Sequence, residues 1–345
     1  MLKKKIIIGA RGSLLSVTQA QEVSRLLKGK FPHLCFSLKK LVTFGDKHRN
    51  WHKSRHCAQG RDLDTGIFVK EIEEALLCGK IDLAVHSLKD LPCVLPKGLE
   101  LAAVPKRHSP QDCIIFKGRK INLLNLRKDA RIGTSSLRRK AQILYWRADL
   151  QVENLRGNLD TRLEKLNSAG FDAIVVALAG VKRLGFKNLF TPPFLPDNIP
   201  VKGRAGFIQI IPTKLMLPAP GQGALGIEIR QGDTKIKALV EKINHCKSFL
   251  CVRSERAFLK ELGAGCRLPL GALAEIEDGK IHLEAVVASP DGKRLLRLSK
   301  TAPLDKSEGS GLPSDRQSQK AEALGKQLAH QMLKKGAGKL LKEDA

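Results

Sequence analysis

The stretch Ile81-Asp82-Leu83-Ala84-Val85-His86-Ser87-Leu88-Lys89-Asp90-Leu91-Pro92 carries the clearest fold signal in the chain. Its first half is a short apolar run, which is typical of a buried strand. Its second half is polar, and the closing Pro92 cannot continue a strand ladder. Ligands of open α/β sheets bind beyond the carboxyl ends of the strands, so the stretch predicts a strand that delivers Lys89 and Asp90 to a site. A solvated strand end is the alternative, and the rest of the chain must decide between them.

The amino-terminal half alternates predicted strands with helical patterns, which is typical of α/β domains built on parallel sheets. A strand predicted over residues 5–10 ends in a turn at Arg11, and Ser13 can cap the helix that follows. Free backbone N–H groups and the helix dipole favour an anion at such a junction. A plain helix cap beside a surface arginine explains this junction equally well.

Three further junctions between a strand and a helix carry hydroxyl or arginine side chains. The stretch Thr134-Ser135-Ser136-Leu137-Arg138-Arg139 opens a predicted helix. Arginine in the first turn opposes the helix dipole, so these arginines need another role. The other two junctions supply Arg156 with Arg162, and Lys182 with Arg183. Bidentate hydrogen bonds to a carboxylate or phosphate would provide that role, and four converging junctions would form a site for a polyanion.

The last third of the chain has a different pattern. The pairs Asp278-Gly279 and Asp291-Gly292 separate three strand-like runs, and Asp-Gly is a strong hairpin signal. The sequence therefore predicts an antiparallel sheet between two helices. The predicted elements are a helix over 248–262, strands over 270–276, 280–288 and 293–301, and a helix over 321–333.

Three segments lack a clear pattern. Residues 47–64 are basic and hold three histidines at spacings of four. A helical metal face is one interpretation, but the missing carboxylate ligands favour a mobile basic loop. Residues 191–217 are rich in proline and predict a long irregular connection, and residues 306–319 predict a flexible segment.

Length and composition bound the function. The chain has 345 residues, enough for two or three domains. A formal net charge of +27 predicts an anionic partner, which can be nucleic acid, anionic lipid or an acidic small molecule. Aromatic residues are only 4%, too few for a good base-stacking platform.

The apolar runs are too short for a signal peptide or a membrane span, so we expect a cytoplasmic protein. The eight cysteines lack CxxC pairs, so we expect neither zinc nor disulfides.

Cys266 stands apart from the other cysteines because it lies on a glycine-containing loop, over residues 263–269. Such a loop keeps a thiol accessible, and a thiolate is a good nucleophile for covalent attachment, although inert packing is the usual role of cysteine. Asp90 should stay ionised among cations, where it can accept hydrogen bonds and stabilise a cationic intermediate. A ligand with outer carboxylates and inner N–H groups, such as an acidic pyrrole, would match this pattern.

Taken together, the motifs of the chain resemble those of the hydroxymethylbilane synthases, also called porphobilinogen deaminases. The resemblance extends from Lys5 to the final helix. The matching motifs, in order, are His86–Pro92, Gly133–Arg139, Leu155–Asn158, Gly221–Ala224, Ser254–Phe258, and Gly265-Cys266 with Pro269.

The resemblance implies an α/β fold: two α/β domains like periplasmic binding proteins, and a smaller C-terminal α+β domain with a three-stranded antiparallel sheet. The implied boundaries are 1–105 with 222–243, 106–217, and 246–345. It also implies a transferase of tetrapyrrole biosynthesis. Such an enzyme deaminates four porphobilinogen molecules, joins them head to tail on a covalent dipyrromethane primer, and releases hydroxymethylbilane by hydrolysis.

The same resemblance implies roles for individual residues. Asp90 would be the catalytic carboxylate, and Cys266 would hold the dipyrromethane cofactor through a thioether. Further cofactor contacts would be Ser87, Lys89, Thr134, Ser136, Arg138, Arg139, Arg162 and Gln222. Substrate contacts would be Arg11, Ser13, Phe68, Arg156 and Arg183. The implied protein is a monomer that needs no metal, nucleic acid or membrane.

Three features depart from the family pattern. Thr65 stands where the family commonly has lysine, residues 47–64 form a longer and more basic loop, and residues 191–217 hold an apparent insertion. Two rival functions also remain. A nucleic-acid-binding protein would explain the charge, but its cations would cluster on one face and no recognition motif is present. A non-catalytic binding protein for an acidic small molecule would share the α/β domains but would not need Cys266.

Overall fold

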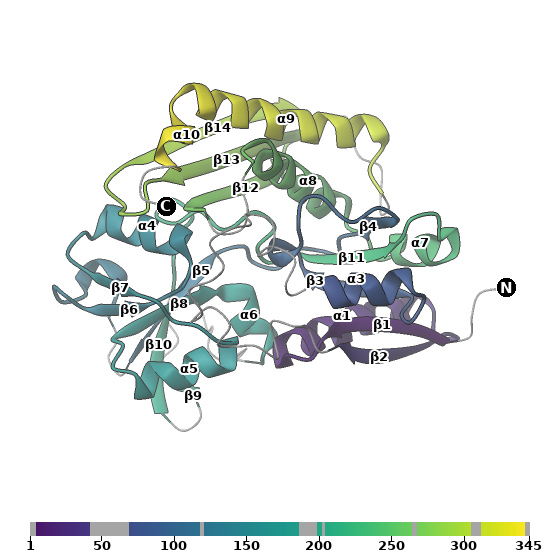
Figure 1. The fold of residues 1–345 in the computed structure, drawn as a ribbon, viewed down its shortest axis with the longest axis horizontal. Coiled ribbons are helices and arrows are strands. Elements are labelled where there is room, and N and C mark those ends of the chain that lie inside the picture. The colour runs from purple at the N-terminus through teal and green to yellow at the C-terminus, as the bar shows by residue number, and fades with distance from the viewer. Residues whose placement is uncertain are drawn as a thin grey trace, which may run out of the picture.

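The computed structural model describes residues 5–41, 69–117, 121–185, 199–201, 204–263, 268–304 and 312–341. Within these ranges the chain forms three sheets. Figure 1 shows the first two sheets side by side, with the third sheet and its helices lying across both. The predicted class, two α/β domains followed by a smaller α+β domain, is confirmed.

The first sheet has the strand order β2-β1-β3-β11-β4. Its central strands are apolar and buried on both faces, because helices cover the sheet. The strands are β1 (Lys5–Arg11), β2 (Cys35–Leu41), β3 (Leu83–Ser87), β4 (Leu99–Ala103) and β11 (Leu225–Arg230). The helices are α1 (Leu14–Lys30), α3 (Lys70–Leu77) and α7 (Thr234–Glu241).

The second sheet has the order β7-β6-β8-β5-β10-β9. Its strands are β5 (Asp112–Lys117), β6 (Arg131–Gly133), β7 (Gln151–Glu153), β8 (Ala173–Ala177), β9 (Ile199–Val201) and β10 (Arg204–Ile210). Its helices are α4 (Leu137–Trp146), α5 (Leu159–Ser168) and α6 (Leu178–Arg183), and a short 3-10 turn, η3 (Leu123–Asn125), precedes β6.

The expectation of parallel sheets is wrong in part, because both sheets are mixed. β1 pairs in parallel with β2 and β3, but β11 is antiparallel to β3 and β4. In the second sheet β5 is antiparallel to β8 and β10. The reason is connectivity: residues 104–111 carry the chain from β4 into the second sheet, and residues 211–224 return it to the first sheet as β11.

The prediction that residues 191–217 are irregular apart from an apolar patch over residues 207–211 is wrong for residues 199–201 and 204–206 and is confirmed for residues 212–217. Residues 199–201 and 204–210 form β9 and β10, which pair with each other, and β10 pairs with β5. Ile208 lies opposite Ile115, and both side chains are buried. The strand is stabilised by a partner about a hundred residues away, which local proline content does not reveal.

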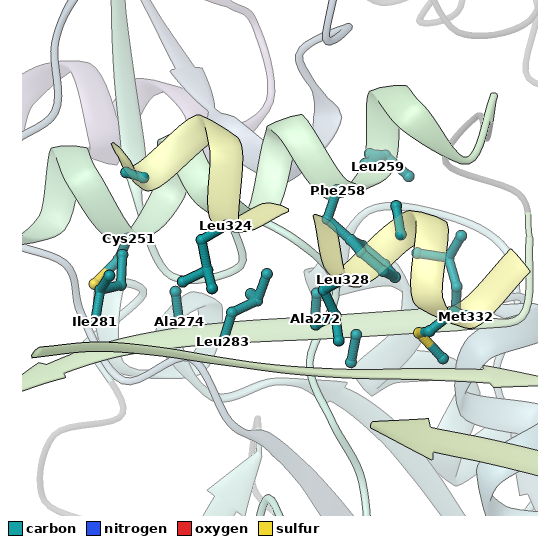
Figure 2. Packing of buried hydrophobic residues seen from close by; sticks show 14 of the residues in the cluster. Cys251, Phe258, Leu259, Ala272, Ala274, Ile281, Leu283, Leu324, Leu328 and Met332 are labelled. Carbon is teal, nitrogen blue, oxygen red and sulfur yellow. The ribbon is translucent and has the colours of Figure 1, made fainter. Parts of the chain in front are cut away.

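The third sheet is an antiparallel meander of β12 (Leu270–Glu277), β13 (Lys280–Ala288) and β14 (Leu295–Pro303). Asp278 and Gly279 have φ angles of 46° and 69°, and two positive φ values are what the tight turn of a two-residue hairpin requires. One face of this sheet packs on α8 (Cys246–Glu261), α9 (Asp315–Lys334) and α10 (Ala337–Leu340). Figure 2 shows Phe258, Leu324, Leu328 and Met332 in this core, between helices and strands.

The closing helix begins earlier than predicted. Ser314 and Gln317 form a reciprocal capping box at the start of α9, which satisfies two backbone N–H groups. The expectation of a flexible segment over 306–319 is therefore wrong from residue 315 onward. At the middle of α9 the helix passes very close to α8, because a Cβ at Gly325 would overlap the backbone oxygen of Ser254.

Candidate active site

The predicted Lys-Asp cluster lies on a short 3-10 turn, η2 (Leu88–Asp90), directly after β3. Leu88 is buried and anchors this turn, its N–H donating to the oxygen of Ala224 at 3.1 Å. Gly221 has a φ of +74°, and a Cβ there would lie 3.2 Å from the backbone of Leu88. The glycine loop, which we define as residues 221–224, thus allows two backbones to meet. The 3-10 turn presents Asp90 to solvent.

A hydrogen-bonded path leads from this turn to the second sheet. Lys89 Nζ donates to Gln222 Oε1 at 3.3 Å, and Gln222 Nε2 donates to Asp112 Oδ1 at 2.9 Å. The same Nε2 also donates to the oxygen of Pro110 at 2.7 Å. Gln222 is completely buried, and it belongs to the returning connection between the sheets. It therefore joins the first sheet to the second at the predicted site.

Asp112 holds both arginines of the second predicted motif. Arg138 Nη1 lies 2.7 Å from Asp112 Oδ2, and Arg139 donates to Oδ1 from Nε at 3.0 Å and from Nη2 at 2.8 Å. Arg138 also donates to the oxygen of Leu217 at 2.7 Å. Burial alone would raise the pKa of Asp112, but the two guanidinium charges and their hydrogen bonds lower it below its usual range. The carboxylate stays ionised and fixes both cations.

The cations around Asp90 influence one another. Burial lowers the pKa of Lys89 to about 8, and the Asp90 carboxylate opposes this shift. Burial also lowers the pKa of Arg162 to about 10, the charge of Arg139 adds to that shift, and Asp90 again opposes it. Asp90 therefore lies within electrostatic reach of Lys89 and Arg162, while Arg139 is close to both. The structure brings these predicted residues together with Gln222 and Arg138.

The predicted serine and threonine residues form hydrogen bonds that fix the local structure of the site. Ser13 Oγ caps α1 by accepting from Ser16 N at 3.3 Å, and Ser136 Oγ caps α4 by accepting from Arg139 N at 3.4 Å. The N–H of Ser136 donates to Thr134 Oγ1 at 3.3 Å. Ser87 Oγ accepts from Gln19 Nε2 at 2.8 Å, which ties β3 to α1.

The remaining predicted residues are placed differently. Arg11 lies at the end of β1, and Arg156 is exposed beside the start of α5. Arg183 lies on α6 and is paired with Glu22 of α1, from Nε to Oε2 at 2.9 Å. Phe68 and Cys266 lie outside the described residues, as do Thr65 and the loop over 47–64.

The sequence reasoning missed the carboxylates that organise the site. Besides Asp112, Glu255 of α8 is completely buried and binds Arg107 at 2.6 Å from Oε1 to Nη1. Glu255 also accepts from Gly221 N at 2.6 Å and from Ala274 N at 2.8 Å. It thereby fixes the glycine loop and β12 to the connection between the sheets. Glu255 stands inside a quoted motif, but its partners come from three distant segments and leave no local signal.

A second contact links the third domain to the turn that carries Asp90. Arg256, also on α8, donates to the oxygen of Leu91 at 2.9 Å and to that of Pro92 at 2.6 Å. These two carbonyls directly follow Asp90 in the chain. Helix α8 therefore contacts the turn of Asp90.

The cations of the site come from both α/β domains and have fixed partners. Asp112 holds Arg138 and Arg139, and Gln222 accepts from Lys89, so these cations need little reorganisation to meet an anion. Arg138 Nε is buried and has no hydrogen-bond partner among the described residues, which leaves a donor for a ligand oxygen.

In the described ranges no group of His, Cys, Asp and Glu could hold a metal ion, and no helix is both long and apolar enough to cross a membrane. Fold and site together define a two-domain α/β protein with fixed cations where its first two sheets are linked.

Comparison with known proteins identifies the family. The family model "Porphobilinogen deaminase, dipyromethane cofactor binding domain" matches residues 6–238, and "Porphobilinogen deaminase, C-terminal domain" matches residues 249–334. The porphobilinogen deaminase of Pelotomaculum thermopropionicum is 42% identical over 99% of this chain and 97% of its own. That of Listeria monocytogenes is 38% identical over 99% of each chain. The chain belongs to the porphobilinogen deaminase family.

Among solved structures, an ancestral arginine-binding protein aligns with 70% of this chain and 91% of its own, at 15% identity and a TM-score of 0.32. The probable amino-acid-binding protein YtmK of Bacillus subtilis aligns with 69% of this chain and 89% of its own, at 12% identity and a TM-score of 0.37. Family membership rests on the sequence relatives.

Proposed function

We propose that this chain deaminates porphobilinogen and condenses four molecules of it into hydroxymethylbilane, on a dipyrromethane primer attached to Cys266. The observation that carries the proposal is the path from Lys89 through Gln222 and Asp112 to the paired arginines, beside the exposed Asp90. This path fixes cations from two domains beside one exposed carboxylate, that of Asp90. The relatives found by sequence comparison are named porphobilinogen deaminase, after this reaction.

Asp90 is the proposed catalytic carboxylate. When ammonia leaves porphobilinogen, positive charge develops on the pyrrole, and an ionised carboxylate nearby stabilises that charge. The Asp90 charge in turn opposes the lowering of the pKa of Lys89 and Arg162 that burial causes, so the three groups interact electrostatically. Hydrogen bonds from a pyrrole N–H to Asp90 would also orient the ring for attack by its neighbour.

The cations have a second role in binding. Porphobilinogen and its condensed products carry carboxylate side chains, and guanidinium groups bind carboxylates through paired hydrogen bonds. Arg138, Arg139 and Arg162 would hold the dipyrromethane cofactor together with Lys89, Ser87, Thr134, Ser136 and Gln222. Arg11, Ser13, Phe68, Arg156 and Arg183 would contact the incoming substrate. The bound dipyrromethane would supply the nucleophilic pyrrole carbon that starts the chain.

Cys266 is the proposed anchor of the primer. A thioether forms from a thiolate, so the anchor must ionise readily. Burial raises the pKa of the thiols of Cys93, Cys113 and Cys246, and it raises that of Cys251 to about 12. Cys93 is partly buried and the other three are buried, so these four cysteines are poor nucleophiles. We also infer a cytoplasmic monomer with domain boundaries at 1–105 with 222–243, 106–217, and 246–345.

Replacing Asp90 with asparagine tests the proposal. Asp90→Asn keeps the size of the side chain and removes its charge, so turnover of porphobilinogen should fall by about a hundredfold or more. Ammonium release and tetrapyrrole formation measure the rate, and the unchanged protein should release four ammonium ions per tetrapyrrole. The matched control is Asp315→Asn, at an exposed position in the first turn of α9, which should keep full activity. Equal activity of both variants would contradict the role of Asp90, and binding without turnover by the unchanged chain would favour the non-catalytic binding protein.

A further inference from the structure

Glu22 forms a charged contact between the first two domains. It lies on α1, and its Oε2 accepts from Arg183 Nε of α6 at 2.9 Å. Its Oε1 lies 3.1 Å from Nε2 of His108, in the connection between the two sheets. The side chain of Arg183 is only 4% exposed and that of Glu22 only 20%. The pair is therefore largely shielded from water, which strengthens it compared with a surface ion pair.

Arg183 already uses one complete edge of its guanidinium group. While Nε binds Glu22, Nη2 donates to the oxygen of Gly223 at 3.2 Å. The same oxygen accepts from the N–H of His108 at 3.3 Å. Nε and Nη2 form a fork that can bind one carboxylate through two parallel hydrogen bonds. A ligand carboxylate can take this fork only by replacing Glu22 at Nε and the oxygen of Gly223 at Nη2.

Glu22 carries its negative charge throughout the working pH range. Burial alone would raise the pKa of Glu22, but the hydrogen bonds and charges of His108 and Arg183 lower it to about 2. The charge of Arg183 is thus compensated inside the protein before any substrate arrives.

We propose that Glu22 is an internal competitor for substrate binding, a carboxylate that occupies Arg183 until an acidic side chain of the substrate replaces it. The inference rests on the proposed function, in which Arg183 contacts porphobilinogen or its products. Glu22 and the substrate carboxylate then compete for one guanidinium group. The competition raises the substrate concentration needed for half-maximal rate, and it couples substrate binding to separation of α1 from α6.

Removing the charge of Glu22 tests this competition. Glu22→Gln keeps the shape of the side chain but leaves a weaker, neutral competitor, so the KM for porphobilinogen should fall about threefold to tenfold, with little change in kcat. The matched control is Glu153→Gln, which removes the carboxylate partner of Arg131, an ion pair in which each side chain is 40% exposed. This control should leave KM unchanged. An unchanged or higher KM in Glu22→Gln would overturn the inference.

A double-mutant cycle separates competition from a merely structural role. With Arg183→Gln in place there is no guanidinium to compete for, so adding Glu22→Gln should no longer change substrate affinity. Calorimetric titration of porphobilinogen into the Asp90→Asn forms of the four proteins gives the same comparison without turnover. An equal gain in affinity with and without Arg183 would contradict the inference. Failure of the proposed function would appear differently, as absence of turnover in the unchanged chain.

Discussion

Individual residues at the site divide into charged side chains near strand ends, which the sequence reveals, and the buried carboxylates that hold them, which it does not. Lys89, Arg138 and Arg139 stand at the ends of strands, where a search for ligand-binding side chains looks first. Asp112 and Gln222, which hold them, are 110 positions apart and meet only in the folded chain. The site could therefore be predicted as a set of cations but not as a network, because its connections depend on tertiary contacts.

Asp112 is the single residue on which this network most depends. Asp112→Asn leaves the guanidinium groups of Arg138 and Arg139 buried without their carboxylate, and breaking a buried ion pair from one side costs about 3–5 kcal/mol. We expect the free energy of unfolding, measured in urea, to fall by about that amount. Glu322→Gln, at the exposed pair with Arg253, should cost about 1 kcal/mol or less. Similar losses in both variants would contradict the role of Asp112.

The ion pairs of Asp112 with Arg138 and Arg139 make the free energy of unfolding depend on pH in a definite direction. The pKa of Asp112 in the folded protein lies below its ordinary value of 3.8. The stabilisation is therefore fully present above the ordinary value and is lost as the pH falls through the folded-state value. Asp112→Asn should show a smaller loss of stability than the unchanged protein when both are titrated from pH 6 toward acid.

Among the structural elements, those with local signals are predicted best. The Asp278-Gly279 turn and the serine cap of α1 were predicted from a few adjacent residues, and the structure confirms them. Strand β10 and the direction of β11 were not, since each depends on a partner strand far away in the sequence. Contact between helices is another long-range feature. No local pattern indicates that Gly325 of α9 must touch α8.

The close approach of α9 to α8 gives a prediction at this scale. Gly325→Ala would place a Cβ against the backbone of Ser254, and overpacking of this kind costs about 1–3 kcal/mol. That cost exceeds the gain of up to about 1 kcal/mol in helix propensity. The matched control is Gly29→Ala in α1, where a Cβ meets nothing within 4 Å, so the same substitution should be neutral or stabilising. Thermal unfolding of both variants checks this, and equal behaviour would contradict the proposed helix contact.

In the whole molecule, helix α8 of the third domain holds both the turn that carries Asp90 and the loop over residues 221–224. Glu255 holds the glycine loop, Arg256 holds the carbonyls after Asp90, and both belong to α8. The three-part architecture was predictable because strands, helices and Asp-Gly turns follow one another in separate blocks. The arrangement of the parts was not, since buried ion pairs and the return of β11 to the first sheet determine it. Much of the net charge of +27 lies outside the site, and the structure gives no explanation of that excess.

The most direct test of the central claim is the intact mass of the purified protein, measured beside that of Cys266→Ser prepared in the same way. If Cys266 anchors a dipyrromethane primer, the unchanged protein should exceed its sequence mass by about two pyrrole units, and the variant should not. Incubation with porphobilinogen should then lengthen the adduct only on the protein that already carries it. An unchanged protein that has its plain sequence mass, even after that incubation, would contradict the account.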